Sequence, residues 1–319
     1  MMMKTEFHTM PGLLIYAEQE QVSGKGEDAF SYSFTRQDHG YIAVFDGCGG
    51  MGSKKYPMLN DRTGARIASR LAGFVVDQFY EKGGFCDFSN ASELLRKALI
   101  NTFSETKAAL AARKSGIMIG GDMFKELPTT LSLIASRLNE QRELETAFIW
   151  AGDSRGYFLD KKGICQVTAD DLETAEDAFS NLRSDGKLSN VVNGDTPFIL
   201  HEKRWIFREP VLLITATDGS FGYFKTPMEF EYTILCAMQQ AADVHQWKTA
   251  LGEAIKKTAG DDFSILISAF GFLDFSACKD YFAQRFRYLR RRFVPNADYV
   301  PEEELQALWD EYRKDYYRW

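Results

Sequence analysis

Asp46-Gly47-Cys48-Gly49-Gly50-Met51-Gly52 directly follows the apolar run Tyr41–Phe45. The run is rich in β-branched and aromatic residues and predicts a buried β-strand. An aspartate at the end of such a strand is held rigidly at the rim of a sheet. The glycine at position 47 has no Cβ, so its backbone carbonyl is open to a ligand. This junction predicts a site built on strand ends.

Acids recur at the ends of other predicted strands. Glu27 and Asp28 precede Ala29–Thr35, Asp153 follows Glu145–Ala151, Asp218 follows Val211–Ala216, and Asp261 and Asp262 precede Phe263–Phe270. A single Asp-Gly pair is typical of a turn. Two carboxylates about 5 Å apart, however, repel by roughly 3 kcal/mol at an effective dielectric of ~20, so several at one rim require cations. An all-oxygen ligand set suits magnesium or manganese.

The remaining patterns predict one α+β unit. Further strands are expected at Leu13–Glu20, Thr130–Leu138 and Gly156–Leu159, with hairpin-turn chemistry after Leu159. Two helices separate the early and middle strands, and each is expected to cover a sheet face. Their apolar stripes are Ile67, Leu71, Phe74, Val75 and Phe79, then Leu95, Leu99, Phe103 and Leu110 with Leu94, Ala98 and Thr102. Two more helices are expected at Pro227–Gln240 and Val244–Thr258.

Composition excludes several classes of protein. The 319 residues carry a net charge of −7, which does not favour nucleic acid as a partner. No run of 18 apolar residues and no signal-peptide pattern occurs, so we expect no membrane span and a cytoplasmic location. The five cysteines form no C-x-x-C pair and are expected to be reduced thiols, and none of the four histidines lies in a convincing catalytic motif.

The ordered motifs Glu27-Asp28, Asp46-Gly47-x-Gly49-Gly50, Gly152-Asp153-Ser154-Arg155, Thr217-Asp218-Gly219 and Asp261-Asp262-Phe263-Ser264 resemble those of the PPM-type serine/threonine phosphatases, the protein phosphatase 2C family. The resemblance covers residues 12–272. It implies two antiparallel sheets packed as a sandwich between helices (αββα), with residues 275–319 as a C-terminal helical extension. It also implies hydrolysis of phosphoserine and phosphothreonine in proteins, opposing a cognate serine/threonine kinase.

The same resemblance assigns the site. The site would hold two manganese or magnesium ions, bridged by the attacking water or hydroxide, and a third ion at Asp153. Asp46 would contact both main ions, the Gly47 carbonyl one of them, and Asp218 and Asp261 the other. Glu27 and Asp28 would act largely through bound water. Asp46, Asp218 and Asp261 are therefore the expected catalytic set.

Some positions depart from the family pattern. Ser23 and Gly24 stand where many members carry a phosphate-gripping arginine, so Lys25 is either a substitute or a solvated loop lysine. Cys48 occupies the place of a histidine proton donor in many eukaryotic members and is either a redox-sensitive thiol or an inert small residue. The missing arginine leaves open an alternative function, a pseudophosphatase that binds phosphoproteins without turnover.

Two further segments bear on substrates. Residues Thr168–Pro210 match a variable flap that shapes substrate access, with Asp171 in place of a histidine, and Arg155 is expected to form a structural ion pair. In the extension, Phe282, Phe286, Leu289 and Phe293 form an apolar stripe opposite much of an arginine-rich face. We expect the stripe to pack on the catalytic unit with the arginines solvated; partner docking or autoregulation, and contact with an anionic membrane or nucleic acid, are the alternatives.

Overall fold

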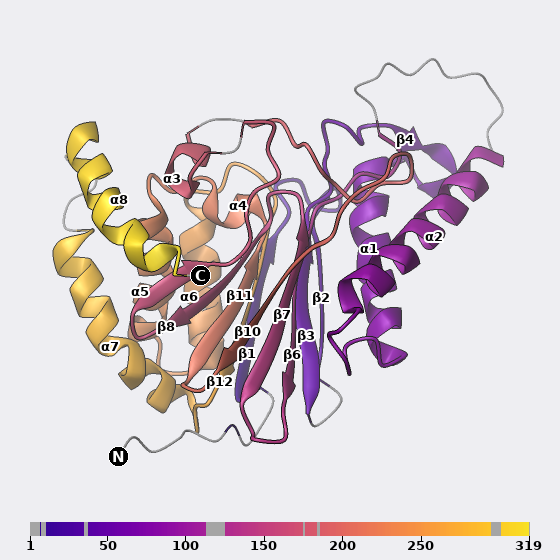
Figure 1. The fold of residues 1–319 in the computed structure, drawn as a ribbon. Coiled ribbons are helices and arrows are strands. Elements are labelled where there is room, and N and C mark those ends of the chain that lie inside the picture. The colour runs from indigo at the N-terminus through magenta and orange to yellow at the C-terminus, as the bar shows by residue number, and fades with distance from the viewer. Residues whose placement is uncertain are drawn as a thin grey trace.

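Two five-stranded antiparallel sheets pack face to face in the computed structural model, with helices outside both (Figure 1). The structure describes residues 7, 11–34, 38–112, 125–174, 176–183, 186–294 and 301–318, except the side chain of Glu302. The first sheet has the order β1-β12-β11-β8-β9: Leu13–Gln19, Phe263–Phe270, Val211–Ala216, Arg155–Asp160 and Gly163–Gln166. The second has the order β10-β7-β6-β3-β2: His201–Phe207, Leu144–Ala151, Leu131–Leu138, His39–Phe45 and Ala29–Ser33. The predicted αββα sandwich is confirmed.

Alternation along β3 explains why this strand is apolar throughout. Ile42 and Val44 belong to the core between the two sheets, whereas Tyr41, Ala43 and Phe45 belong to the core beneath the helices. Successive side chains of a strand point to opposite faces of the sheet. A strand whose two faces are both covered therefore carries apolar residues at every position. Asp46 is the first acidic residue after this strand and lies at its edge.

Helices α1 (Gly64–Glu81) and α2 (Ala91–Ala112) cover the outer face of the second sheet (Figure 1). The predicted stripes are partly wrong, because Phe74 and Leu94 are exposed. The face of α1 that meets the sheet carries small residues such as Ala68 and Ala72. Close packing against the sheet therefore selects the alanines rather than the largest apolar side chains.

Helices α5 (Pro227–Gln240) and α6 (Val244–Lys256) cover the first sheet, joined by α7 (Phe275–Arg292) and α8 (Glu302–Tyr316) of the extension. Phe282, Leu289 and Phe293 are buried in the same core as α5, which confirms that the stripe packs on the catalytic unit. The expectation that the arginines are solvated is wrong for Arg285. It is buried and forms two hydrogen bonds, of 2.8 and 2.9 Å, to the carboxylate of Glu231 on α5.

Several smaller elements complete the chain. The hairpin expected after Leu159 joins β8 to β9, with Gly163 at a positive φ of 122°. Strand β10, which pairs with β7, was not predicted. The short elements are β4 (Lys55–Tyr56), η1 (Pro57–Leu59), β5 (Arg62–Thr63), α3 (Ala178–Asn181) and α4 (Asp218–Phe221). All five cysteines are free thiols, as expected. None of the described helices is long and apolar enough to cross a bilayer.

Candidate active site

Acids from separate strand ends gather at one end of the sandwich. Burial raises the pKa of Asp46 well above its usual range, and the negative charges of four other acids raise it further: Asp218, Asp28, Asp153 and Asp261. Charges affect one another this strongly only when they lie close together in a medium that screens poorly. The structure thus brings together five of the acids that the sequence singled out.

Backbone contacts hold Asp46 in place at the end of β3. Its amide donates to Thr130 Oγ1 at 3.1 Å, and its carbonyl accepts from the Thr130 amide at 2.8 Å and from Thr129 Oγ1 at 2.7 Å. The next residue must be glycine, because a Cβ at position 47 would lie 2.6 Å from the Ala65 carbonyl oxygen and 2.8 Å from that of Glu27. The absence of a side chain at Gly47 therefore allows three chain segments to meet.

Asp218 lies at the start of α4, directly beyond β11. Burial raises its pKa, as does the charge of Asp261, while a hydrogen bond with Asp46 opposes the rise. Asp28, at the start of β2, has its pKa raised to about 8 by burial, although Thr217 Oγ1 donates to its Oδ2 at 2.7 Å. Thr217, one residue before Asp218, was not flagged from the sequence; its place in the Thr-Asp-Gly motif was the available signal.

Asp153 has one side-chain oxygen without a hydrogen-bond partner. It follows Gly152, which has a positive φ of 96°. Burial raises the pKa of Asp153 to about 8, with contributions from the charges of Asp218 and Asp170. Its Oδ1 is buried and has no hydrogen-bond partner in the structure. A buried oxygen without a donor is costly for the fold and is suited to a cation.

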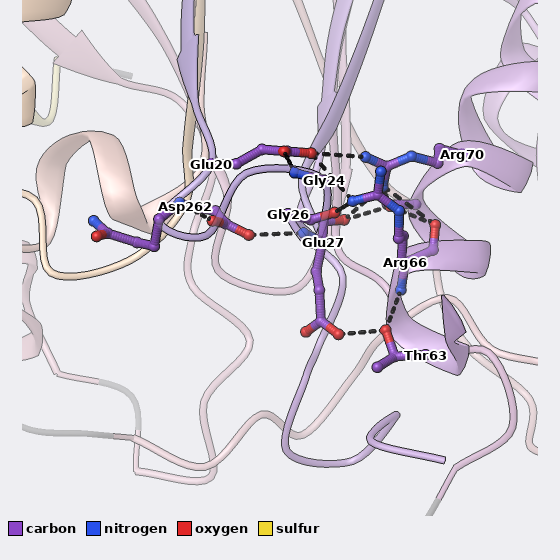
Figure 2. Close-up of polar contacts among 10 residues, drawn as sticks. Glu20, Gly24, Gly26, Glu27, Thr63, Arg66, Arg70 and Asp262 are labelled. Atoms are coloured by element: carbon purple, nitrogen blue, oxygen red, sulfur yellow. Dashed lines mark hydrogen bonds and ion pairs between the residues drawn. The ribbon is translucent and has the colours of Figure 1, made fainter. Parts of the chain in front are cut away.

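The Glu27 side chain points toward Thr63, the residue before α1 (Figure 2). Its Oε1 accepts from Thr63 Oγ1, and its amide donates to Asp262 Oδ2 at 2.7 Å. A Cβ at Gly49 would clash with Glu27 Oε2. Burial raises the pKa of the Glu27 carboxyl, and the charges of Asp262 and Asp261 add to the effect. Glu27 therefore reaches the same rim from the loop before β2.

The loop that carries Lys25 is anchored at its base. Arg66 of α1 donates to Glu20 Oε1 at 3.1 Å and to the Gly26 carbonyl (Figure 2). The Asp262 carboxylate accepts hydrogen bonds of 2.7 Å from the backbone amides of Gln21 and Glu27. These two bonds hold both ends of the loop. Lys25 itself is exposed on this loop. Its predicted contact with phosphate stays a prediction.

The acids fit divalent cations in chemistry more clearly than in arrangement. Among the residues that the structure describes, no three histidine, cysteine or acidic side chains come together as a ready metal-binding group. Asp261 is exposed at the rim, whereas Asp46 is half buried. The donors are nevertheless all oxygen atoms, their charges repel, and Asp153 Oδ1 lacks a partner. These properties suit hard cations such as magnesium or manganese.

A cavity of about 400 Å³ adjoins this cluster and is bounded by the flap. Asp153 and Asp218 line one side, and α3 of the flap lines another through Asn181 and Leu182. Arg155 forms a buried bidentate ion pair with Asp170, at 2.9 and 2.6 Å, which confirms its expected structural role. Asn181 donates to the same carboxylate at 2.8 Å, so this ion pair connects the flap to the strand that follows Asp153.

Asp171, which the resemblance placed where a histidine was expected, is partnered by the histidine at position 201. His201 Nε2 lies 2.9 Å from Asp171 Oδ1, and Asn190 donates to Oδ2 at 2.6 Å. This contact joins the first residue of β10 to the start of the flap. Sequence reasoning missed this pair because the two residues are 30 positions apart.

Comparison with solved structures agrees with the architecture. The chain resembles the serine/threonine phosphatase Stp1 from Staphylococcus aureus, with a TM-score of 0.59 and 15% identity over 84% of this chain and 98% of Stp1. It also resembles the serine/threonine phosphatase PstP/Ppp from Mycobacterium tuberculosis, with a TM-score of 0.53 and 18% identity over 80% of this chain and 97% of PstP/Ppp. The PPM Ser-Thr phosphatase MsPP from Mycobacterium smegmatis has a TM-score of 0.52 and 14% identity to this chain. The match covers 81% of this chain and 98% of MsPP.

The chain has the fold of the bacterial PPM-type phosphatases. No protein-family model matches the sequence, and no curated protein does. At identities of 14 to 18% the likeness lies in the backbone arrangement, so the PPM fold is established by structure alone. In this fold the acidic cluster lies at one end of the sandwich, on the loops that join the strands of both sheets.

Proposed function

We propose that this protein is a metal-dependent phosphatase that hydrolyses phosphoserine and phosphothreonine in proteins. The observation that carries the proposal is the convergence of Asp28, Asp46, Asp153, Asp218 and Asp261 from five separate chain segments. A cluster whose members raise one another's pKa is costly to maintain and is typical of a functional site. The similarity to solved serine/threonine phosphatases supports the same activity.

The proposed cofactors are two manganese or magnesium ions, with a third, weaker ion at Asp153. Asp46, the Gly47 carbonyl, Asp218 and Asp261 would hold the first two, and Glu27 and Asp28 would act largely through water. When bound, such ions lower the pKa of water and offset negative charge on the phosphoryl group.

The protein's own contribution is positional. Strand ends hold the carboxylates rigidly, and Thr217 orients Asp28 through its hydroxyl. Asp262 fixes the loop that carries Lys25, whose charge we propose to attract the phosphate. The flap bounds the adjoining cavity and would select among phosphoproteins. We further propose that residues 12–272 form the phosphatase unit and 275–319 its extension, and that the protein opposes a serine/threonine kinase in the cytoplasm.

Hydrolysis of p-nitrophenyl phosphate and of a phosphothreonine peptide, with manganese and then with excess chelator, tests the proposal. We expect manganese-dependent turnover that Asp46→Ala lowers by at least about a hundredfold, as loss of one preorganised electrostatic group does in other enzymes. Asp87→Ala, at an exposed acid outside the cluster, is the matched control. Manganese-independent turnover, or equal turnover in Asp46→Ala, would refute the proposal. Binding of the phosphopeptide without turnover would instead establish the pseudophosphatase.

A further inference from the structure

A second group of reactive side chains lies at the far end of β3 from Asp46. His39 is the first residue of this strand, and Asp46 follows its last residue. Seven residues of strand span about 20 Å, so the two groups are well separated. His39 lines a cavity of about 470 Å³ together with Asp38, Cys86 and Arg137. The chemistry available to this second group therefore does not depend on the proposed phosphatase activity.

The three side chains Asp38, His39 and Cys86 form a continuous hydrogen-bonded series. His39 Nδ1 lies 2.9 Å from Asp38 Oδ1, and His39 Nε2 lies 3.5 Å from Cys86 Sγ. A carboxylate only accepts, so it selects the tautomer in which Nδ1 carries the proton. The lone pair of Nε2 then faces the thiol and can accept its proton.

The imidazole is held firmly, and the cysteine beside it is an exposed residue. Only 8% of the His39 side chain is exposed. Its ring packs against that of Tyr80 at a centroid distance of 5.5 Å, and the Tyr80 hydroxyl donates to the His39 carbonyl at 3.3 Å. Cys86, by contrast, is exposed, and its carbonyl accepts from Arg137 Nη1 at 2.5 Å. A fixed base beside an open nucleophile is the arrangement that activates thiols in enzymes.

The other cysteines lack this combination. Cys48, Cys165 and Cys278 are buried, and burial raises the pKa of the Cys165 and Cys278 thiols to about 11 and about 12. Cys236 is partly accessible, but its side chain hydrogen-bonds to the amide of Gln240, at 3.3 Å, and to Tyr232, and neither is an imidazole. Among the described cysteines, Cys86 is the one that is an exposed residue and has an adjacent imidazole.

We propose that Cys86 is a site of oxidation by hydrogen peroxide, with His39 as its base and Asp38 as the positioning residue. His39 takes the proton from the Cys86 thiol, and the sulfur attacks one peroxide oxygen. The S–O bond forms as the O–O bond breaks, and the departing hydroxide leaves as water with the proton from His39. The sulfur is oxidised to a sulfenic acid and the peroxide is reduced. Asp38 stabilises the imidazolium that exists between the two proton transfers.

The test compares two cysteines within one molecule. The full chain is treated with hydrogen peroxide at pH 7 in the presence of a sulfenic-acid trap, and labelling of Cys86 and Cys236 is followed by peptide mass spectrometry. We expect Cys86 to be labelled at least about tenfold faster than Cys236, a threshold set below the roughly hundredfold that a positioned base typically supplies. Because the ratio is internal, a general loosening of the fold affects both cysteines.

Three variants test whether fast labelling of Cys86 depends on the relay of Asp38 and His39 or only on the exposure of the cysteine. His39→Gln should lower the ratio to near one, and Asp38→Asn should lower it several-fold, since the imidazolium loses its partner. Asp87→Asn removes a carboxylate next to Cys86 in sequence but outside the relay, and it should not lower the ratio. Equal labelling of Cys86 and Cys236 in the native chain would overturn the proposal. So would a ratio unchanged in either His39→Gln or Asp38→Asn.

Discussion

The indole Nε1 of Trp309 donates a hydrogen bond of 2.8 Å to Oδ2 of Asp177. Asp177 is the N-cap of α3, the flap helix that bounds the cavity beside Asp153, so the C-terminal helix α8 directly supports the wall of the candidate active site. Tyr317 strengthens the contact, since its hydroxyl accepts from the Ala178 amide at 2.7 Å. The extension therefore does more than cover a sheet.

Trp309→Phe keeps an aromatic ring against Phe179 but removes the hydrogen bond to Asp177. A hydrogen bond of about 1 kcal/mol corresponds to about a fivefold change in an equilibrium. We expect KM for phosphopeptides to rise about that much while kcat for p-nitrophenyl phosphate, which is too small to need the flap, stays the same. Trp247→Phe, in α6 and outside the cavity, is the matched control. Equal effects on both substrates would argue against a role for α8 in substrate selection.

Arg285→Met should destabilise the protein strongly. The carboxylate of Glu231 has no exposed surface, and among the described side chains this change leaves it with the Tyr312 hydroxyl as a hydrogen-bond donor. Breaking one side of a buried ion pair costs about 3–5 kcal/mol, whereas replacing both sides by apolar residues is often neutral. Urea unfolding should show that loss in Arg285→Met and recovery in Glu231→Leu/Arg285→Met. Arg292→Ala, which removes an exposed pair with Glu311, should cost less than about 1 kcal/mol.

Asp153→Asn should stabilise the metal-free protein in a pH-dependent manner. The pKa of Asp153 is raised from 3.8 to about 8 on folding, so the folded state binds more protons than the unfolded state between these values. Stability of the native chain consequently falls as pH rises from about 4 to about 8, and the amide avoids this loss. We expect the Tm in chelator to rise by several degrees at pH 8.5 and by less at pH 5. A larger gain at the lower pH would contradict this assignment.

Lys25→Ala tests whether the exposed loop lysine binds phosphate. If its charge attracts the substrate, KM for p-nitrophenyl phosphate should rise about threefold or more while kcat changes little, because a point charge on a flexible stem acts mainly on binding. Lys25→Arg should restore or lower KM. Lys82→Ala, at an exposed lysine at the end of α1, is the control. A KM unchanged in Lys25→Ala would mean that this lysine is only solvated.

Local patterns were sufficient for most of the sandwich and for the acidic residues. An aspartate directly after a predicted strand lies at the rim of the sheet, whatever the place of that strand in the sheet. A β-pattern followed by Asp-Gly therefore identifies a rim residue from local sequence. Strand β10 escaped because it is an edge strand whose side chains include the charged run Glu202-Lys203-Arg204, which resembles a loop in composition. Its structure depends on pairing with β7, which the sequence of β10 alone does not encode.

Contacts between distant residues account for the rest. Arg285 looked like one member of a solvated basic face because Glu231 lies 54 positions earlier. His39 lay in no recognisable motif because Cys86 lies 47 positions later. The exposed Phe74 shows a different limit: periodicity locates the faces of a helix, but how closely the sheet approaches decides which residues pack against it.

The pairing of β1 with β12 has a consequence for synthesis of the chain. Leu13 lies opposite Ala269 and Gln19 opposite Phe263, so the first strand completes its ladder with the last. During translation the backbone of β1 cannot pair with β12 until some 250 further residues have left the ribosome. Closure of such long loops slows folding and leaves strand edges open to aggregation. Nascent chains of this protein should therefore depend on chaperones until the final strand is released.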